Sequence, residues 1–201
     1  MIETLNVDLF NLINADDRAR PWVVEGARIL AEGPVWGAVV IVVVLWVRGS
    51  AEKRQALLST GLGLACSLAG AFMIADVWPH LRPAELGLGR QLLFHAAEAS
   101  FPSDHVTFLL TIGLGFLSAG RIRAWGGLIC ALAIGTAWAR VYLGIHFPLD
   151  MFGALLLALV GALVTRLTKP RLAVVLLPHV VRVYETILRV LHFPRAAFPR
   201  K

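Results

Sequence analysis

The chain of 201 residues is too apolar for an ordinary soluble domain, with 58% hydrophobic residues, 16% charged residues and a mean hydropathy of +0.73. Its formal net charge of +6 comes mainly from basic residues at the ends of apolar segments, which is the pattern that sets membrane topology. A nucleic-acid-binding protein needs a continuous basic face on a soluble fold, so we expect no nucleic-acid partner.

In chain order, the hydropathy pattern predicts one short interfacial helix and five membrane-spanning helices. The interfacial helix falls within residues 1–20, where several aliphatic side chains share one helical face. In the second span, Gly61, Gly63 and Gly70 permit close helix packing. The third span is shorter than the roughly 20 residues of a full crossing. The five spans are expected at about 24–47, 55–77, 105–119, 125–142 and 151–167.

Two polar stretches connect or follow these spans. Residues 78–104 form the longest polar connection, in which 91–99 is compatible with a short surface helix. Residues 168–201 are basic and contain Pro178, which favours an interfacial amphipathic tail over a sixth crossing, the alternative. The predicted architecture is an all-α, polytopic membrane helix bundle, with one transmembrane domain over 1–167 and a basic tail over 168–201 suited to binding anionic membrane lipids.

The distribution of Lys and Arg predicts the orientation of the bundle. Thirteen of these residues lie in the connections and tail on one side of the predicted spans, against five on the other side. Because the basic side stays inside, we expect the C-terminus in the cytoplasm and the N-terminus outside. The connections that carry Arg82, His105 and Arg140 then share the outer face of the membrane.

Three polar clusters interrupt the apolar sequence: Arg82-Pro83, Phe101 to His105, and Arg140 to Asp150. Charged side chains at the membrane are costly and indicate a functional site. An arginine presents a planar fork of donors that fits phosphate oxygens, so Arg82 and Arg140 are candidate phosphate clamps. Ser103 adds a donor at the start of the third helix, where a helix N-terminus favours anions.

The two histidines of these clusters supply candidate reacting groups. A histidine can attack phosphorus when a carboxylate holds its other ring nitrogen, and Asp150 lies four residues after His146. The intervening Phe147-Pro148 predicts a helix start at which both side chains face the same side. His105 is suited to protonate the departing oxygen, because an imidazole titrates near neutrality. The pattern therefore predicts binding and cleavage of a phosphate at the membrane surface.

Together these residues resemble the type 2 phosphatidic acid phosphatases (PAP2), which share a core with the vanadium haloperoxidases. The three family motifs match in order and spacing at Arg82-Pro83, Pro102-Ser103-Asp104-His105, and Arg140 with His146 and Asp150. The resemblance implies a metal-independent phosphatase that needs no cofactor. It also implies that His146 forms a phosphohistidine, that Asp150 orients His146 and that His105 is the acid, while Arg82, Ser103 and Arg140 hold the phosphate.

The chain departs from the family pattern at three positions. Ala75 stands where the first motif has Lys, so one clamp charge is missing, and His80 or Arg90 is a candidate replacement. Ala139 replaces the Ser of the third motif. Asp104 replaces the Gly of the second motif, and we assign it to the phosphate-binding set. The resulting Phe-Pro-Ser-Asp-His form is similar to that of the bacterial undecaprenyl pyrophosphate phosphatases of the bacitracin-resistance (BcrC) type.

This second resemblance implies a substrate and a biological role. The expected reaction is hydrolysis of undecaprenyl diphosphate to the monophosphate carrier lipid and inorganic phosphate in the bacterial inner membrane, which serves peptidoglycan synthesis. Phosphatidylglycerol phosphate, phosphatidic acid and lipid A phosphates are alternative substrates. A non-catalytic transporter or scaffold is a further alternative, favoured by the missing Lys. A metal site formed by His105, His146 and Asp150 is another, but no closely spaced pair of histidines supports it.

Overall fold

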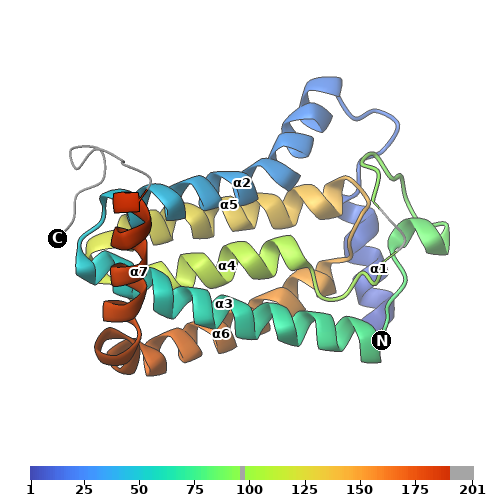
Figure 1. Ribbon diagram of the computed structural model, residues 1–201. Coiled ribbons are helices and arrows are strands. Elements are labelled where there is room, and N and C mark those ends of the chain that lie inside the picture. The colour runs from blue at the N-terminus through green and yellow to red at the C-terminus, as the bar shows by residue number, and fades with distance from the viewer. Residues whose placement is uncertain (96–97, 191–201) are drawn as a thin grey trace.

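The computed structural model describes residues 1–95 and 98–190, without the side chains of 169, 170 and 172–174. Five helices lie side by side along one axis and form a bundle (Figure 1). Two further helices, α1 (Ile2–Ile13) and α7 (Leu177–Val190), lie across opposite ends of the bundle (Figure 1). The bundle helices are α2 (Pro21–Arg48), α3 (Ala51–Val77), α4 (Asp104–Leu117), α5 (Arg123–Tyr142) and α6 (Pro148–Val175).

Four of the five predicted spans are long and apolar enough to cross a membrane, at 21–48, 51–77, 120–142 and 148–168. The remaining one, α4, has only 14 residues. At 1.5 Å per residue it is about 21 Å long, which is less than the hydrocarbon thickness of about 30 Å. Figure 1 shows that α3 and α5 extend further toward the α1 end of the bundle than α4 does. The polar segment before α4 therefore enters the bundle between its longer neighbours.

The long connection between α3 and α4 differs from its prediction. The described residues of 91–99 are not helical, and the helical turn of this connection is instead η1, a 3₁₀ helix at Pro83–Leu86. Proline at the first position presets the backbone for such a turn. Gly87 follows with φ of 67°, the left-handed conformation that ends helical turns and favours glycine.

The C-terminal stretch is more helical than expected. The helix that contains the fifth span continues past 167 to Val175. The next helix, α7, is amphipathic and has 14 residues, which is too short for a sixth crossing. The end of the predicted basic tail, 191–201 with Arg195, Arg200 and Lys201, lies outside the described residues.

Small residues let α3 and α6 pack closely. A Cβ atom added at Gly63 would collide with the carbonyl oxygen of Gly161. The hydroxyl of Ser67 donates to the carbonyl oxygen of Gly63 at 3.0 Å and, across the interface, to that of Leu157 at 2.9 Å. Close backbone approach and polar contacts between helices hold membrane bundles together, because lipid tails compete for apolar contacts.

The other two glycines of α3 face different surroundings. A Cβ at Gly70 would lie 3.1 Å from the Leu157 side chain of α6, whereas a Cβ at Gly61 would meet nothing within 4 Å. The prediction of close packing is therefore confirmed for Gly63 and Gly70 and wrong for Gly61, which lines a groove on the surface of the bundle.

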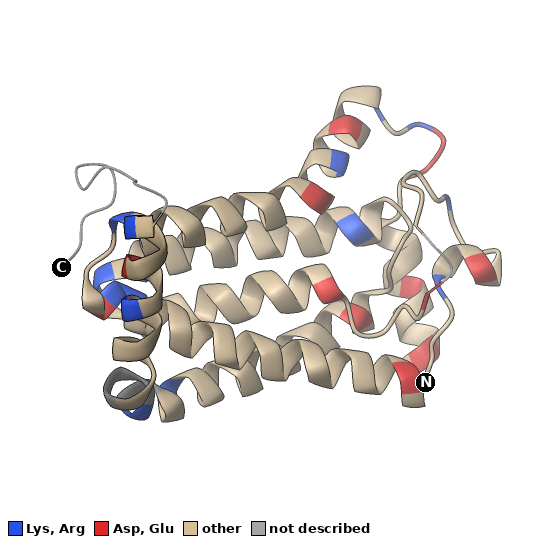
Figure 2. Ribbon diagram, in the orientation of Figure 1, with Lys and Arg blue, Asp and Glu red and all other residues tan. Residues whose placement is uncertain are grey.

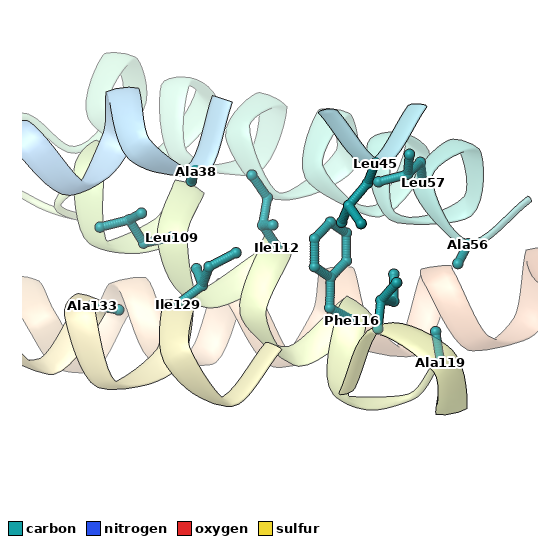
Figure 3. Close-up of a cluster of buried hydrophobic side chains, with 11 residues drawn as sticks. Ala38, Leu45, Ala56, Leu57, Leu109, Ile112, Phe116, Ala119, Ile129 and Ala133 are labelled. Carbon is teal, nitrogen blue, oxygen red and sulfur yellow. The ribbon is translucent and has the colours of Figure 1, made fainter. Parts of the chain in front are cut away.

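An apolar layer lies where α4 meets α2, α3 and α5 (Figure 3). Leu109, Ile112 and Phe116 extend from α4 into this layer and are 3% exposed or less. Figure 3 shows the ring of Phe116 pointing toward Leu45 of α2 and Leu57 of α3. The layer holds the short helix α4 in register with its longer neighbours.

Basic and acidic residues concentrate at opposite ends of the bundle (Figure 2). Basic residues gather at the end that carries α7, where Arg121 pairs with Glu52 at 2.7 Å. At the same end, buried Arg54 donates to the carbonyl oxygen of Trp46 at 3.0 Å and lies over the Tyr184 ring of α7, 5.1 Å from its centroid. Acidic residues gather at the α1 end, to which all three polar clusters of the sequence belong (Figure 2).

We expect Gly63→Val to lower the free energy of unfolding by about 1–3 kcal/mol, because overpacking forces α3 and α6 apart. Gly61→Val is the matched control, since its Cβ enters open space. Thermal unfolding of both purified variants in one detergent tests this. Equal midpoints for the two variants would contradict the close approach of α3 to α6.

Candidate active site

The polar clusters of the sequence converge at the α1 end of the bundle. One arginine precedes η1, the second lies in the last turn of α5, and the histidines and carboxylates lie at the starts of α4 and α6. The predicted set comprises Arg82, Ser103, Asp104, His105, Arg140, His146 and Asp150. Most of these side chains are buried, although the segments that carry them are far apart in the sequence.

The centre of the site is the imidazole of His146, which is 2% exposed. Its Nδ1 lies 2.9 Å from Oδ2 of Asp150, while its Nε2 lies 3.3 Å from an Nη atom of Arg82 and 3.3 Å from one of Arg140. A guanidinium can only donate, so Nε2 is the acceptor and Nδ1 carries the proton that Asp150 accepts. The lone pair of Nε2 therefore points between two cations.

Burial and the charges of Arg140 and Arg82 hold the pKa of the His146 imidazole well below its ordinary value of 6.5. Burial also lowers the pKa of the Arg82 guanidinium, and the nearby carboxylates oppose that effect. An arginine still remains charged near neutral pH. At neutral pH the site thus combines a neutral imidazole with two fixed positive charges, a charge distribution that suits binding of a phosphate dianion.

Backbone carbonyls hold Arg82 in place. Its Nε donates to the carbonyl oxygen of Glu98 at 3.0 Å, and its two Nη atoms donate to those of Ile145 at 2.8 Å and Ala99 at 3.3 Å. Its own backbone N–H donates to the carboxylate of Glu85 at 2.8 Å. The guanidinium therefore ties the segment before α4 to the loop before α6.

Two buried donors of the site have no hydrogen-bond partner in the described part of the chain. They are Nε of Arg140 and the hydroxyl of Ser103, and both residues are 2% exposed or less. The Nη1 of Arg140 donates to the carbonyl oxygen of Ala31 at 3.3 Å, which fixes the orientation of the fork. Buried polar groups are normally paired, so this pair of donors fits a site that binds an anion.

The structure adds Ser100, which the sequence interpretation did not assign to the site. Its hydroxyl donates to Oδ2 of Asp150 at 2.5 Å and lies 3.4 Å from Nδ1 of His146. The same carboxylate oxygen accepts the backbone N–H of Phe147 at 2.8 Å. Three donors therefore converge on one oxygen of Asp150, and they fix the direction in which it presents its lone pairs to His146.

His105 and Asp104 occupy the first turn of α4, at the mouth of the site. His105 is partly exposed and lies close enough to Arg140 for the positive charge of that guanidinium to act on it. Asp104 is exposed and lies close enough to Arg140 and Arg82 for their positive charges to act on it. An ionised carboxylate repels phosphate, so a role for Asp104 in phosphate binding requires its protonated form or the arginines as intermediaries.

The candidates for the missing Lys have other surroundings. Arg90 donates to the carbonyl oxygen of Asp16 at 2.5 Å and pairs with Asp17 at 3.4 Å, so its bonds lead to the N-terminal segment. His80 packs against the Trp78 ring at a centroid distance of 4.3 Å. The imidazole of His95 instead approaches that of His146, with a distance of 6.3 Å between the ring centroids.

The N-terminal segment supports the site from outside the bundle. Asn14 accepts the backbone N–H of Arg90 at 2.7 Å and donates to the carbonyl oxygens of Arg90 and Tyr142, each at 3.1 Å. Gly144, with φ of 75°, passes so close to this knot that a Cβ would collide with the Arg90 carbonyl. Asn6 of α1 accepts the backbone N–H of Leu149 at 3.0 Å, at the start of α6.

A metal site at these residues has little support. Among the described residues, no group of three His, Cys, Asp or Glu side chains is arranged to hold a metal ion. The Nε2 atom of His146 that a metal would need lies between two guanidinium groups. Two fixed cations disfavour a third at the same nitrogen.

The sequence matches the PAP2 superfamily over residues 52–173, which is more than half of the chain. The chain belongs to the PAP2 superfamily. It is 41% identical over 163 residues to "Putative undecaprenyl-diphosphatase YbjG" of Escherichia coli (strain K12), covering 81% of this chain and 82% of that protein. It is also 33% identical over 152 residues to undecaprenyl-diphosphatase BcrC of Bacillus subtilis (strain 168), covering 74% of this chain and 75% of that protein.

Solved structures of PAP2 proteins share the fold. The crystal structure of Aquifex aeolicus LpxE matches with a TM-score of 0.68 at 24% identity, over 80% of this chain and 94% of that one. The first transmembrane PAP2-type phosphatidylglycerolphosphate phosphatase from Bacillus subtilis matches with a TM-score of 0.59 at 17% identity, over 85% of this chain and 87% of that one. The predictions of an all-α membrane bundle and of a PAP2 core are confirmed, and this PAP2 protein is a multi-pass membrane protein.

Ser100→Ala should lower kcat by about 10- to 100-fold, the usual effect of losing a group that orients a catalytic side chain. Without the hydroxyl, Asp150 loses one of the donors that fix its carboxylate, while Arg82 and Arg140 stay in place. We therefore expect KM to change little. Phosphate release at varied substrate concentration measures both constants, and Ser118→Ala at the far end of α4 is the control. An unchanged kcat in Ser100→Ala would remove Ser100 from the site.

The lowered pKa of His146 predicts that its imidazole is still neutral at pH 6.5. The neutral form is present above the folded-state pKa, so it persists until the pH falls well below 6.5. Nitrogen-15 NMR of the histidine-labelled protein distinguishes the neutral Nδ1–H tautomer from imidazolium, and the signal lost in His146→Gln assigns the resonance. A protonated His146 at pH 6.5 would be inconsistent with a buried imidazole between two arginines.

Proposed function

We propose that this PAP2 protein removes the terminal phosphate of undecaprenyl diphosphate, leaving undecaprenyl phosphate and inorganic phosphate. The observation that carries this proposal is the His146 imidazole, with Asp150 on Nδ1 and both arginines at Nε2. The substrate follows from the two relatives named undecaprenyl-diphosphatases, which are 41% and 33% identical to the chain.

In the first step, Nε2 of His146 attacks the terminal phosphorus and forms a phosphohistidine. The bond between that phosphorus and the bridging oxygen breaks, and His105 gives its proton to the oxygen that leaves with the lipid monophosphate. The growing positive charge on His146 is balanced by Asp150 through the Nδ1–H. The transferred phosphoryl group is held by Arg82, Arg140 and the hydroxyl of Ser103. Catalysis of phosphoryl transfer depends chiefly on such positioning and on charge stabilisation.

In the second step, water attacks the phosphohistidine from the side that the lipid monophosphate has left. His105, now neutral, accepts a proton from that water, so it starts the next cycle as the acid. The phosphorus–nitrogen bond breaks, inorganic phosphate leaves and Nε2 recovers its lone pair. Each group of the site thus returns to its starting protonation state without a metal or cofactor.

The protein would act in the bacterial cytoplasmic membrane with its active site facing outward. The separation of charge supports this orientation, because the basic end with α7 then stays in the cytoplasm (Figure 2). We further propose that residues 1–167 form the catalytic domain and that 168–201, including α7, lie in the cytoplasmic interface against anionic lipid. Such an enzyme recycles the carrier lipid of peptidoglycan synthesis and contributes to bacitracin resistance.

The detergent-solubilised protein should release phosphate from undecaprenyl diphosphate in the presence of a chelator. His146→Ala and His105→Ala should each lower kcat by about 10³-fold or more, because they remove the nucleophile and the acid. Brief reaction with substrate labelled in its terminal phosphate should trap an acid-labile phosphohistidine in the wild type and none in His146→Ala. Full activity of His146→Ala would exclude the mechanism.

Competition in the same assay distinguishes the substrates. Phosphatidic acid, phosphatidylglycerol phosphate and lipid A phosphate should each be cleaved with a lower kcat/KM than undecaprenyl diphosphate. A higher kcat/KM for one of them would retain the phosphatase chemistry and replace the substrate. Absence of phosphate release from all four would favour a non-catalytic role.

A further inference from the structure

We propose that the prenyl chain of the substrate binds in a groove between α2, α3 and α4, whose first lining residue on α4 is Phe108, about one helical turn after His105. This inference rests on the proposed function and names the part of the protein that recognises the lipid. The groove has a volume of about 250 Å³ and is lined almost entirely by apolar side chains. Val39 and Val43 of α2 form one wall, Leu57 and Leu64 of α3 form the other, and Phe108 of α4 forms the floor.

The floor of the groove continues directly from the acid of the active site. Phe108, Ile112 and Phe116 follow His105 at spacings of three or four residues, so all four lie along one face of α4. Figure 3 shows Ile112 and Phe116 pointing from α4 into the space between α2 and α3. Because His105 protonates the leaving oxygen, the lipid attached to that oxygen starts at the same place as this apolar stripe.

A second apolar groove, of about 460 Å³, lies between α1 and α6 and is the rival for the same chain. Its lining includes Asp150, Phe147 and His80, so it lies behind the nucleophile. In an in-line displacement the leaving oxygen lies on the side of phosphorus opposite Nε2 of His146. The prenyl chain of the lipid therefore extends away from His146 and Asp150, which favours the groove on α4.

Gly61 of α3 is a position from which an added side chain would enter the groove. It is one of the lining residues, and a Cβ at this position would meet nothing within 4 Å. A larger side chain here would fill the groove without displacing a helix. Gly127 of α5 is the matched position outside the groove, since it is also exposed and its added Cβ also meets nothing.

The test compares Gly61→Phe with Gly127→Phe on two diphosphates of different chain length. Gly61→Phe should lower kcat/KM for undecaprenyl diphosphate by about tenfold. The kcat/KM for isopentenyl diphosphate should stay unchanged, because that substrate is too short to reach Gly61. Gly127→Phe should change neither. Leu156→Phe, which fills the rival groove, should also leave both unchanged. A selective loss in Leu156→Phe would move the chain to the rival groove.

An equal loss on both substrates in Gly61→Phe, or no loss on either, would overturn the proposal while phosphatase activity of the wild type persists. Absence of phosphate release by the wild type would instead refute the proposed function. Thermal unfolding of each variant separates a folding defect from a binding defect, and Val43→Trp reaches the same groove from α2 if Gly61→Phe is unstable.

Photocrosslinking gives a direct readout that does not depend on turnover. A polyprenyl diphosphate with a diazirine near the head of its chain should label peptides of α2, α3 and α4 that line the groove, and excess unlabelled undecaprenyl diphosphate should suppress the labelling. Labelling of α1 and α6 would assign the chain to the rival groove. If excess undecaprenyl diphosphate does not suppress the labelling, bulk lipid fills the groove. That result would also overturn the proposal.

Discussion

The hydrogen bond between His146 and Asp150 is the contact on which the geometry of the site depends. Holding Nδ1–H against the carboxylate leaves the lone pair of Nε2 to face Arg82 and Arg140. The bond requires the short loop before α6 to turn back at Gly144, whose left-handed backbone passes against the segment that Asn14 holds. The start of α6, the end of α5 and the N-terminal segment are thereby arranged around a single imidazole.

The groups that would bind phosphate also fold the segments that carry them. Arg82 donates to the carbonyl oxygens of Glu98 and Ala99 in the connection before α4, and to that of Ile145 in the loop before α6. Charged donors give stronger hydrogen bonds than neutral ones, and stronger still when buried. The same guanidinium thus organises the backbone near α4 and presents its charge to Nε2 of His146, so a loss of Arg82 combines both effects.

Much of the fold and part of the site were predictable because membranes penalise polarity. Apolar runs of sufficient length marked four spans, and Arg140, His146 and Asp150 were conspicuous as titratable residues clustered where two of these spans adjoin. Ser100 was not recognisable, since a serine in a polar connection has no local signal, and its role arises when that connection folds back onto Asp150. The short helix that the sequence allowed within 91–99 is absent from the described residues of that segment, where backbone contacts such as Leu92 to Leu143 hold an irregular path.

The sequence by itself determined the class of structure, the approximate spans and the positions of the polar clusters, because unpaired charge is too costly in lipid to occur without a partner or a function. Only the tertiary structure decided which donors share each acceptor and which faces of the helices are covered. Gly61 and Gly63 illustrate the limit: they are two residues apart, which is about 200° around a helix, and one lines a groove while the other contacts α6. Local pattern makes both equally suited to packing, and the choice depends on how α3 is rotated against helices that are distant in the sequence.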